Sequence, residues 1–313
     1  MLHLRAISPP ERTDAVQALL VAEPGATHIV VLPGAAVEPA GDVVEADLAR
    51  EAADDVLGRL RELGLERSGG ITLTTLDTTL SDAAERAEEA APGDPGDAVI
   101  WDELAGRTGE DSRLTVSYQV FLSIACLLAA IGAITDSPVT VVGAMVLGPE
   151  FGPLAALSVG LVLRRRDLVG HGAFATVVGF AIAIAVTAVG ALLMDVTGLL
   201  TVEDVLNVQQ VDFVYEVGPF SFIIALLAGA AGMLSLTSSR SAALVGVFIS
   251  VTTVPAAAYA AVAAVEGQYA RAGESALQLL INIAGIIVAA SAVLVLSRWL
   301  RRRRTGDRVL SSR

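Results

Sequence analysis

Six long apolar runs follow Arg113, and polar or charged residues separate each run from the next. Each run holds close to the ~20 residues that a helix needs to cross the hydrocarbon core of a bilayer. The pattern therefore predicts an α-helical polytopic membrane protein with six spans. We expect it in the bacterial cytoplasmic (inner) membrane, with the lipid bilayer as its first partner. The predicted spans cover residues 114–134, 138–163, 169–194, 219–236, 242–265 and 276–297.

Residues 1–80 show a different pattern. Short segments in which apolar and polar residues alternate are separated by segments whose apolar residues have helical spacing. Residues 2–7, 27–32, 42–48 and 69–76 read as strands, and helical stripes lie after the first and third strands. Residues 33–39, between two prolines, read as a loop. The order βαββαβ predicts an α+β, ferredoxin-like domain on the cytoplasmic side. Such a domain serves either as a sensor for a small-molecule ligand or as a module for homo-oligomer assembly, and the sequence favours neither.

The charges are concentrated before the first span. Residues 1–113 hold 23 of the 34 acidic residues and 9 of the 21 basic residues. Residues 81–113 form an acidic linker followed by an amphipathic connector around Trp101, which lies either on the membrane surface or against the soluble domain. A nucleic-acid partner would need a basic stripe, and this acidic domain has none, so no nucleic-acid partner is expected.

Arginine clusters predict how the spans are oriented. The clusters at 164–166, 240 and 298–304 all fall on one side of a six-span chain. Short arginine-rich loops stay in the cytoplasm. Both termini are therefore expected there, with residues 298–313 as a basic cytoplasmic tail.

The second run is interrupted in its middle by prolines, glycines and one acidic residue. Proline removes a backbone donor and clashes with the preceding turn, so an unbroken helix is not expected at this point. A broken backbone and a carboxylate are tolerated in lipid only inside protein or beside water. The alternative is a kinked structural helix whose acidic side chain reaches one membrane surface. The residues of this candidate substrate or ion site are Gly148, Pro149, Glu150, Gly152 and Pro153.

An internal repeat suggests where a second half of this site lies. Residues 124–132 and 224–232 match at five positions with an offset of 100. We predict an inverted three-plus-three repeat of residues 114–200 and 220–297, with compositional coincidence as the alternative. Inverted repeats with paired broken helices place binding sites near the membrane midplane. The second half would comprise Ser250, Thr252, Thr253, Pro255 and Asn282, whose alternative role is hydrogen bonding between helices.

The sequence offers little support for a catalytic site or for a metal site with cysteine ligands. Cys126 is the only cysteine, and the spans contain neither a Ser/His/Asp set nor an HExxH motif. We therefore expect no enzymatic activity, no catalytic residues and no metal site. The sequence identifies no cofactor.

The segment 133–153, with its Gly-Ala-Met core followed by Pro-Glu-Phe-Gly-Pro, resembles the DUF389 family of bacterial membrane proteins. Residues 245–255 and 281–283 look like the same family, and the resemblance covers roughly 114–297. It implies a hydrophobic membrane domain and supplies no settled activity.

Two functional hypotheses follow. The first is a transporter or channel for a small solute or ion, regulated by the cytoplasmic domain. The second is a non-transporting membrane sensor, scaffold or lipid- or pigment-binding protein that oligomerises through its helices. An essential role for Glu150 in transport would separate them.

Overall fold

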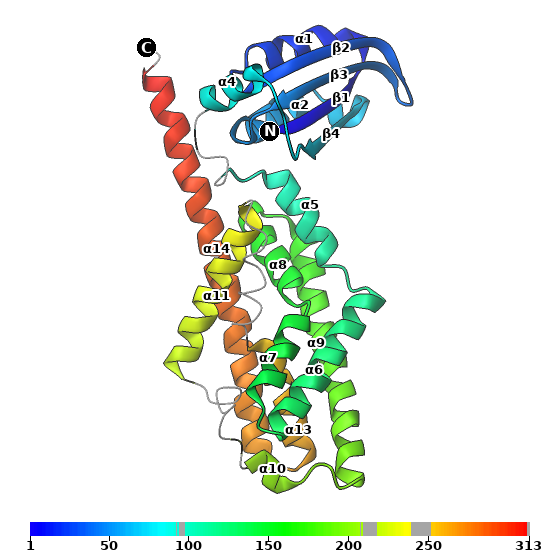
Figure 1. Cartoon of the computed structure of the whole chain (residues 1–313), viewed down its shortest axis with the longest axis vertical. Helices are drawn as coiled ribbons and strands as arrows, with labels where there is room; N and C mark the ends of the chain where they lie inside the picture. Colours follow the sequence, from blue (N-terminus) through cyan, green and yellow to red (C-terminus); the bar gives the residue numbers. More distant parts are fainter. Residues whose placement is uncertain (92, 94–97, 207, 209–217, 239–251, 312–313) are drawn as a thin grey trace. The chain divides into compact units, whose positions relative to one another are not determined.

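The computed structural model describes residues 1–91, 93, 98–206, 208, 218–238 and 252–311 (Figure 1). The chain divides into two compact units. The first is formed mainly by Met1–Asp102, and the second contains most of the residues from Glu103 onward. Each unit has its own hydrophobic core.

The first unit contains a four-stranded antiparallel sheet with the strand order β2-β3-β1-β4 (Figure 1). This is the βαββαβ order predicted from the sequence, with short additional helices. The elements are β1 (Leu2–Ser8), α1 (Pro10–Val21), β2 (Ala26–Val37), β3 (Ala40–Leu48), α2 (Arg50–Glu62), α3 (Leu65–Ser68), β4 (Gly70–Thr75) and α4 (Asp82–Ala90).

The interpretation of residues 33–39 as a loop was wrong, because β2 continues through most of them. Ala36 pairs with Gly41 and Val37 with Ala40, after a shift in register that accommodates Pro33 and Gly34. The backbone N–H of Gly34 donates a 2.8 Å hydrogen bond to the Asp42 carboxylate. A side chain on the partner strand thus satisfies a donor in the irregular part of β2.

Alternation along the strands places one face of the sheet against α1 and α2. On β1 the buried positions are Leu2, Leu4 and Ala6, every second residue, as a half-buried strand requires. Burial of each leucine contributes about 1.5–3 kcal/mol of transfer free energy. Ile100 is 2% exposed and belongs to the same core, so the segment before α5 packs within the first unit.

The second unit is helical (Figure 1). Its helices are α5 (Trp101–Asp111), α6 (Val116–Ile134), α7 (Pro138–Leu147), α8 (Phe151–Leu163), α9 (Arg166–Val196), α10 (Val202–Leu206), α11 (Pro219–Thr237), α13 (Thr253–Val265) and α14 (Tyr269–Ser311).

Four helices in the described part of the chain are long and apolar enough to cross a membrane: α6, α9, α11 and the segment Tyr269–Leu300 of α14. The pair α7 and α8 qualifies jointly, with a 52° bend, either as a broken span or as a re-entrant loop. The predicted fifth span, 242–265, is described only from residue 252. Its helix α13 has 13 residues, which cover about 20 Å at 1.5 Å per residue. Six spans therefore remain a prediction.

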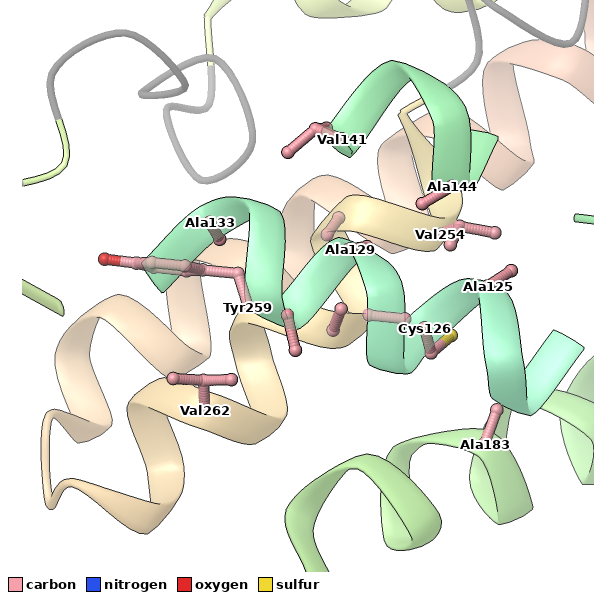
Figure 2. Close-up of a cluster of buried hydrophobic side chains, with 14 of the residues drawn as sticks. Ala125, Cys126, Ala129, Ala133, Val141, Ala144, Ala183, Val254, Tyr259 and Val262 are labelled. Carbon is pink, nitrogen blue, oxygen red and sulfur yellow. The ribbon is translucent and has the colours of Figure 1, made fainter. Parts of the chain in front are cut away.

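The core of the second unit is built largely from small side chains on α6, α7 and α13 (Figure 2). Ala125, Ala129 and Ala133 recur at helical spacing along α6 and are almost completely buried. Small residues let helix backbones approach closely, which is how helices associate in an apolar solvent. Large apolar side chains such as Val177 and Leu193 instead lie exposed on α9, as suits a lipid-facing surface.

The helices of the second unit recur at a nearly constant offset. Val116 and Pro219, which begin α6 and α11, are 103 residues apart, and the first residues of α9 and α14 have the same separation. For α8 and α13 the offset is 102. The packing is reciprocal, because α8 contacts α14 while α13 contacts α9. These offsets differ by two or three residues from the offset of 100 in the sequence match, and the inverted repeat stays a prediction.

Candidate functional site

The break in the second apolar run lies where the sequence predicted it. Helix α7 ends at Leu147 and α8 begins at Phe151. Gly148 has φ −67° and ψ 126°, the extended conformation imposed on a residue that precedes proline. Pro153 lies in the first turn of α8, where its missing N–H is not needed. The local sequence is therefore sufficient to explain the break.

Glu150 is the N-cap residue of α8, and its side chain points into protein. The residue is 4% exposed, so it does not reach a membrane surface as the alternative interpretation required. Its Oε1 accepts a 2.7 Å hydrogen bond from the hydroxyl of Thr253, which is fully buried at the start of α13. The break between α7 and α8 thus lies against the start of α13, so the two segments predicted to form the site are in contact.

The second carboxylate oxygen, Oε2 of Glu150, is buried and has no hydrogen-bond partner among the described residues. It lies against the α-carbon of Gly148. A β-carbon built there would stand 2.2 Å from Oε2 and 2.8 Å from a methyl group of Val254. Glycine at this position therefore makes room for the carboxylate to fold back over the break.

The electrostatic surroundings of Glu150 are unbalanced. The N-termini of α8 and α13 both lie at the carboxyl group, and helix dipoles favour negative charge there. No ion pair with Glu150 occurs in the described part of the chain. An ionised carboxylate without a cation is costly to bury, and two helix ends offset that cost only in part.

A second polar contact lies beside the first. The side-chain amide of Asn282, on α14, donates a 2.7 Å hydrogen bond to the hydroxyl of Thr252. Thr252 is the N-cap residue of α13 and directly precedes the partner of Glu150. Asn282 is 2% exposed, so this contact lies in the interior of the helix bundle.

The remaining predicted residues that the structure describes lie in the α7–α8 break or in the first turns of α8 and α13, and none of them joins these two contacts. Gly152 faces the end of α5, because a β-carbon there would lie 2.9 Å from the backbone oxygen of Asp111. Pro255 is buried in the first turn of α13. Pro149 occupies the break itself. Ser250 lies outside the described residues.

Sequence reasoning missed two polar residues of α14, Ser275 and Gln278. Both are buried, at 0% and 1% exposure. The sixth span was predicted to begin at residue 276, with Ser275 in a polar loop, but α14 begins at Tyr269. The available signal was the helical spacing of polar residues through 271, 275, 278 and 282.

Among the described residues, no group of three or more His, Cys, Asp or Glu side chains lies close enough together to hold a metal ion. The site consists instead of one carboxylate, two threonine hydroxyls and one amide.

Comparison with known proteins agrees with the sequence pattern. The family model described as "Domain of unknown function (DUF389)" matches residues 145–288. An uncharacterised protein of Methanocaldococcus jannaschii is 23% identical over 212 residues. The alignment covers 68% of this chain and 63% of that relative, which is less than two thirds of its length. No solved structure matches this chain. The predicted resemblance to the DUF389 family is confirmed for residues 145–288, the segment that holds Glu150, Thr253 and Asn282.

Proposed function

We propose that this protein is an integral membrane protein that moves a small ion or solute across the bilayer, with Glu150 as its coupling group. The observation that carries the proposal is the Glu150–Thr253 contact, where the break between α7 and α8 meets the start of α13 inside the protein. Ionisable residues inside membrane domains are costly, and they commonly mark ion pathways and proton relays.

The arrangement resembles the physical solution found in secondary transporters. There, half-helix N-termini point at the transported group near the middle of the bilayer. Here Glu150 is the N-cap of α8, and Thr253 opens α13. Both helices have 13 residues, fewer than the ~20 that a full span requires. We infer that the contact lies at the crossing of two half-helices.

The orientation proposed from the arginine clusters gains support from one contact. Arg298, near the end of α14, donates a 3.3 Å hydrogen bond to the backbone oxygen of Val162, near the end of α8. The basic cluster 164–166 directly follows α8, so two of the clusters share one end of the second unit. We propose that this end faces the cytoplasm and that both termini lie there.

We propose a regulatory role for the first unit, with homo-oligomer assembly as its alternative. Asp47 accepts hydrogen bonds from Nδ1 of both His3 and His28, at 2.8 and 2.7 Å. Two of the three histidines thus converge on one carboxylate. This is a polar feature that a ligand or proton could perturb without disturbing the hydrophobic core.

Transport by purified protein in lipid vesicles tests the proposal. Flux of protons and of small cations should be measured for the wild type, Glu150→Gln and Ser158→Ala. Ser158 is the control, because it is also buried in α8 and its hydroxyl donates to the Leu154 oxygen of its own helix at 2.9 Å, with a longer 3.5 Å contact to the Ile287 oxygen of α14. We expect Glu150→Gln to fall to the level of protein-free vesicles and Ser158→Ala to retain flux. Unchanged flux in Glu150→Gln would refute the coupling role.

A further inference from the structure

A line of polar side chains runs along one face of α14. Successive members are four, three and four residues apart, so all of them lie on the same side of the helix. The inner three are at most 2% exposed, in a segment otherwise built from apolar residues. We define this polar line as Arg271, Ser275, Gln278 and Asn282.

The polar line faces α13, which runs antiparallel to it. Arg271 donates a 3.2 Å hydrogen bond to the hydroxyl of Tyr259, at the middle of α13. Ser275 donates to the backbone oxygen of Ala256 at 2.8 Å. Asn282 reaches Thr252 at the start of α13, beside the partner of Glu150. The line therefore leads from one end of the bundle to the buried carboxylate.

Gln278 has the least complete set of contacts in the line. It is 1% exposed, yet its side-chain oxygen Oε1 has no hydrogen-bond partner among the described residues. An unpaired buried amide oxygen is unfavourable. Water or a passing protonated group would satisfy it.

The equivalent face of α9 shows that packing does not require polar residues here. With the offset of 103 between α9 and α14, the counterparts of the polar line are Leu168, Gly172, Ala175 and Gly179. All four are buried against neighbouring helices, as are the inner three residues of the polar line. Apolar and small residues therefore fill the corresponding face of α9, whereas polar residues fill that of α14.

The outer end of the line is built around α10. Tyr259 donates a 2.8 Å hydrogen bond to the backbone oxygen of Val205, and Arg271 donates to the backbone oxygens of Val205 and Leu206. These are carbonyls at the end of α10, where intrahelical donors are lacking. The guanidinium thus holds the end of α10 at the outer end of the polar line.

The surroundings of Glu150 favour a proton as the transferred species. A β-carbon at Gly148 would stand within 3 Å of both this free oxygen and a methyl group of Val254, so apolar atoms lie beside Oε2, whereas a metal cation needs several oxygen atoms to replace its hydration shell. Tyr118 and Cys126, both on α6, interact electrostatically with Glu150, and neither supplies a positive charge. A proton needs only a lone pair on Oε2.

We propose that the polar line on α14 is the route by which protons reach Glu150 from the end of the bundle that holds α10. A protonated water transfers its proton to Oε2, which forms a carboxylic acid and leaves neutral water. Release of that proton toward the opposite side restores the carboxylate. This inference rests on the transport function proposed above and adds the transferred species and its path.

Thiol accessibility tests the path without depending on flux. In a Cys126→Ala background, Gln278→Cys and Ala175→Cys place one thiol on the polar line and one on the equivalent face of α9. Protein in lipid vesicles is treated with a small cationic thiosulfonate reagent. We expect the thiol at 278 to react at least about ten times faster, since dry buried thiols are inert. Equal, slow reaction at both positions would overturn the proposed path.

Measurements of proton flux distinguish the proposed proton path from the proposed transport function. Gln278→Leu should reduce proton flux by about tenfold or more, because an apolar side chain interrupts the line. Thr187→Val is the control, since Thr187 is buried and donates within its own helix. Loss of flux in Glu150→Gln with normal flux in Gln278→Leu would refute the path and leave the transport proposal standing. Normal flux in both variants would refute both.

Discussion

The hydroxyl of Thr253 donates a 2.7 Å hydrogen bond to the carboxylate of Glu150, although the two residues are 103 positions apart in the chain. One residue caps α8 and the other opens α13, so the contact ties together two short helices. Because both partners are almost completely buried, the contact organises polar chemistry inside an otherwise apolar unit.

Thr253→Val tests this contact directly. Valine keeps the shape of threonine and removes the donor, which leaves both carboxylate oxygens of Glu150 without a side-chain hydrogen bond. We expect a loss of about 1–3 kcal/mol in unfolding free energy. Thr253→Ser should retain most of the stability because it keeps the hydroxyl. Denaturant unfolding in detergent measures both, and equal stability of the two variants would contradict the assigned contact.

Gly148→Ala should disturb the same site by sterics. The added β-carbon would lie 2.2 Å from Oε2 of Glu150, far inside van der Waals contact, so the carboxylate must move. Gly143→Ala is the matched control, because its β-carbon would meet no atom within 4 Å. In α7 the control change should be neutral or stabilising by up to about 1 kcal/mol. Thermal unfolding of the two variants gives the comparison, and a Gly148→Ala protein as stable as Gly143→Ala would contradict the crowding.

Asp42 gives the first unit a predictable response to acid. Hydrogen bonds from the Thr13 hydroxyl and the Gly34 N–H lower the pKa of Asp42 below its ordinary value of 3.8. A lowered carboxyl pKa contributes stability above 3.8 that is lost as the pH falls through the folded-state value. Asp42→Asn should remove this pH dependence.

Hydrogen exchange of the β2 and β3 amides in the full chain, followed as the pH is lowered, would measure this response. After correction for the intrinsic exchange rate, wild-type protection should decline in acid, while the Asp42→Asn protein should start lower and change less. Parallel curves for the two proteins would show that another carboxylate is responsible.

The effect of Glu266 on stability should change with pH in the direction opposite to that of Asp42. Burial raises the pKa of Glu266, and the nearby acidic residues Asp195 and Asp204 raise it further. A raised carboxyl pKa costs stability when the pH rises through it, because the charged form is disfavoured in the folded protein. Glu266→Gln should therefore raise the thermal midpoint at neutral pH. The gain should shrink in acid, and a midpoint lowered at neutral pH would contradict this account.

Features governed by neighbouring residues were predictable from the sequence. The break between α7 and α8 follows from Gly148 and Pro149, because proline restricts the residue before it wherever the chain goes. Period-two alternation predicted β1, and helical spacing predicted α2. The DUF389 resemblance was likewise readable from a short segment.

Features that depend on distant partners were not predictable in the same way. The start of α14 lies seven residues earlier than expected, among polar residues that hydropathy assigned to a loop. There Arg271 finds the carbonyls of α10, which local sequence cannot reveal. Residues 33–37 join β2 because β3 pairs with Ala36 and Val37 beyond a shift in register, in spite of their loop-like composition.

The sequence by itself determined that Glu150 lies in a broken apolar segment, since proline and glycine act through the local backbone. The tertiary structure decided that this carboxylate is buried and which atoms surround it. Both depend on helices more than a hundred residues away, whose close packing brings Thr253 to one oxygen of Glu150 and leaves the other unpaired.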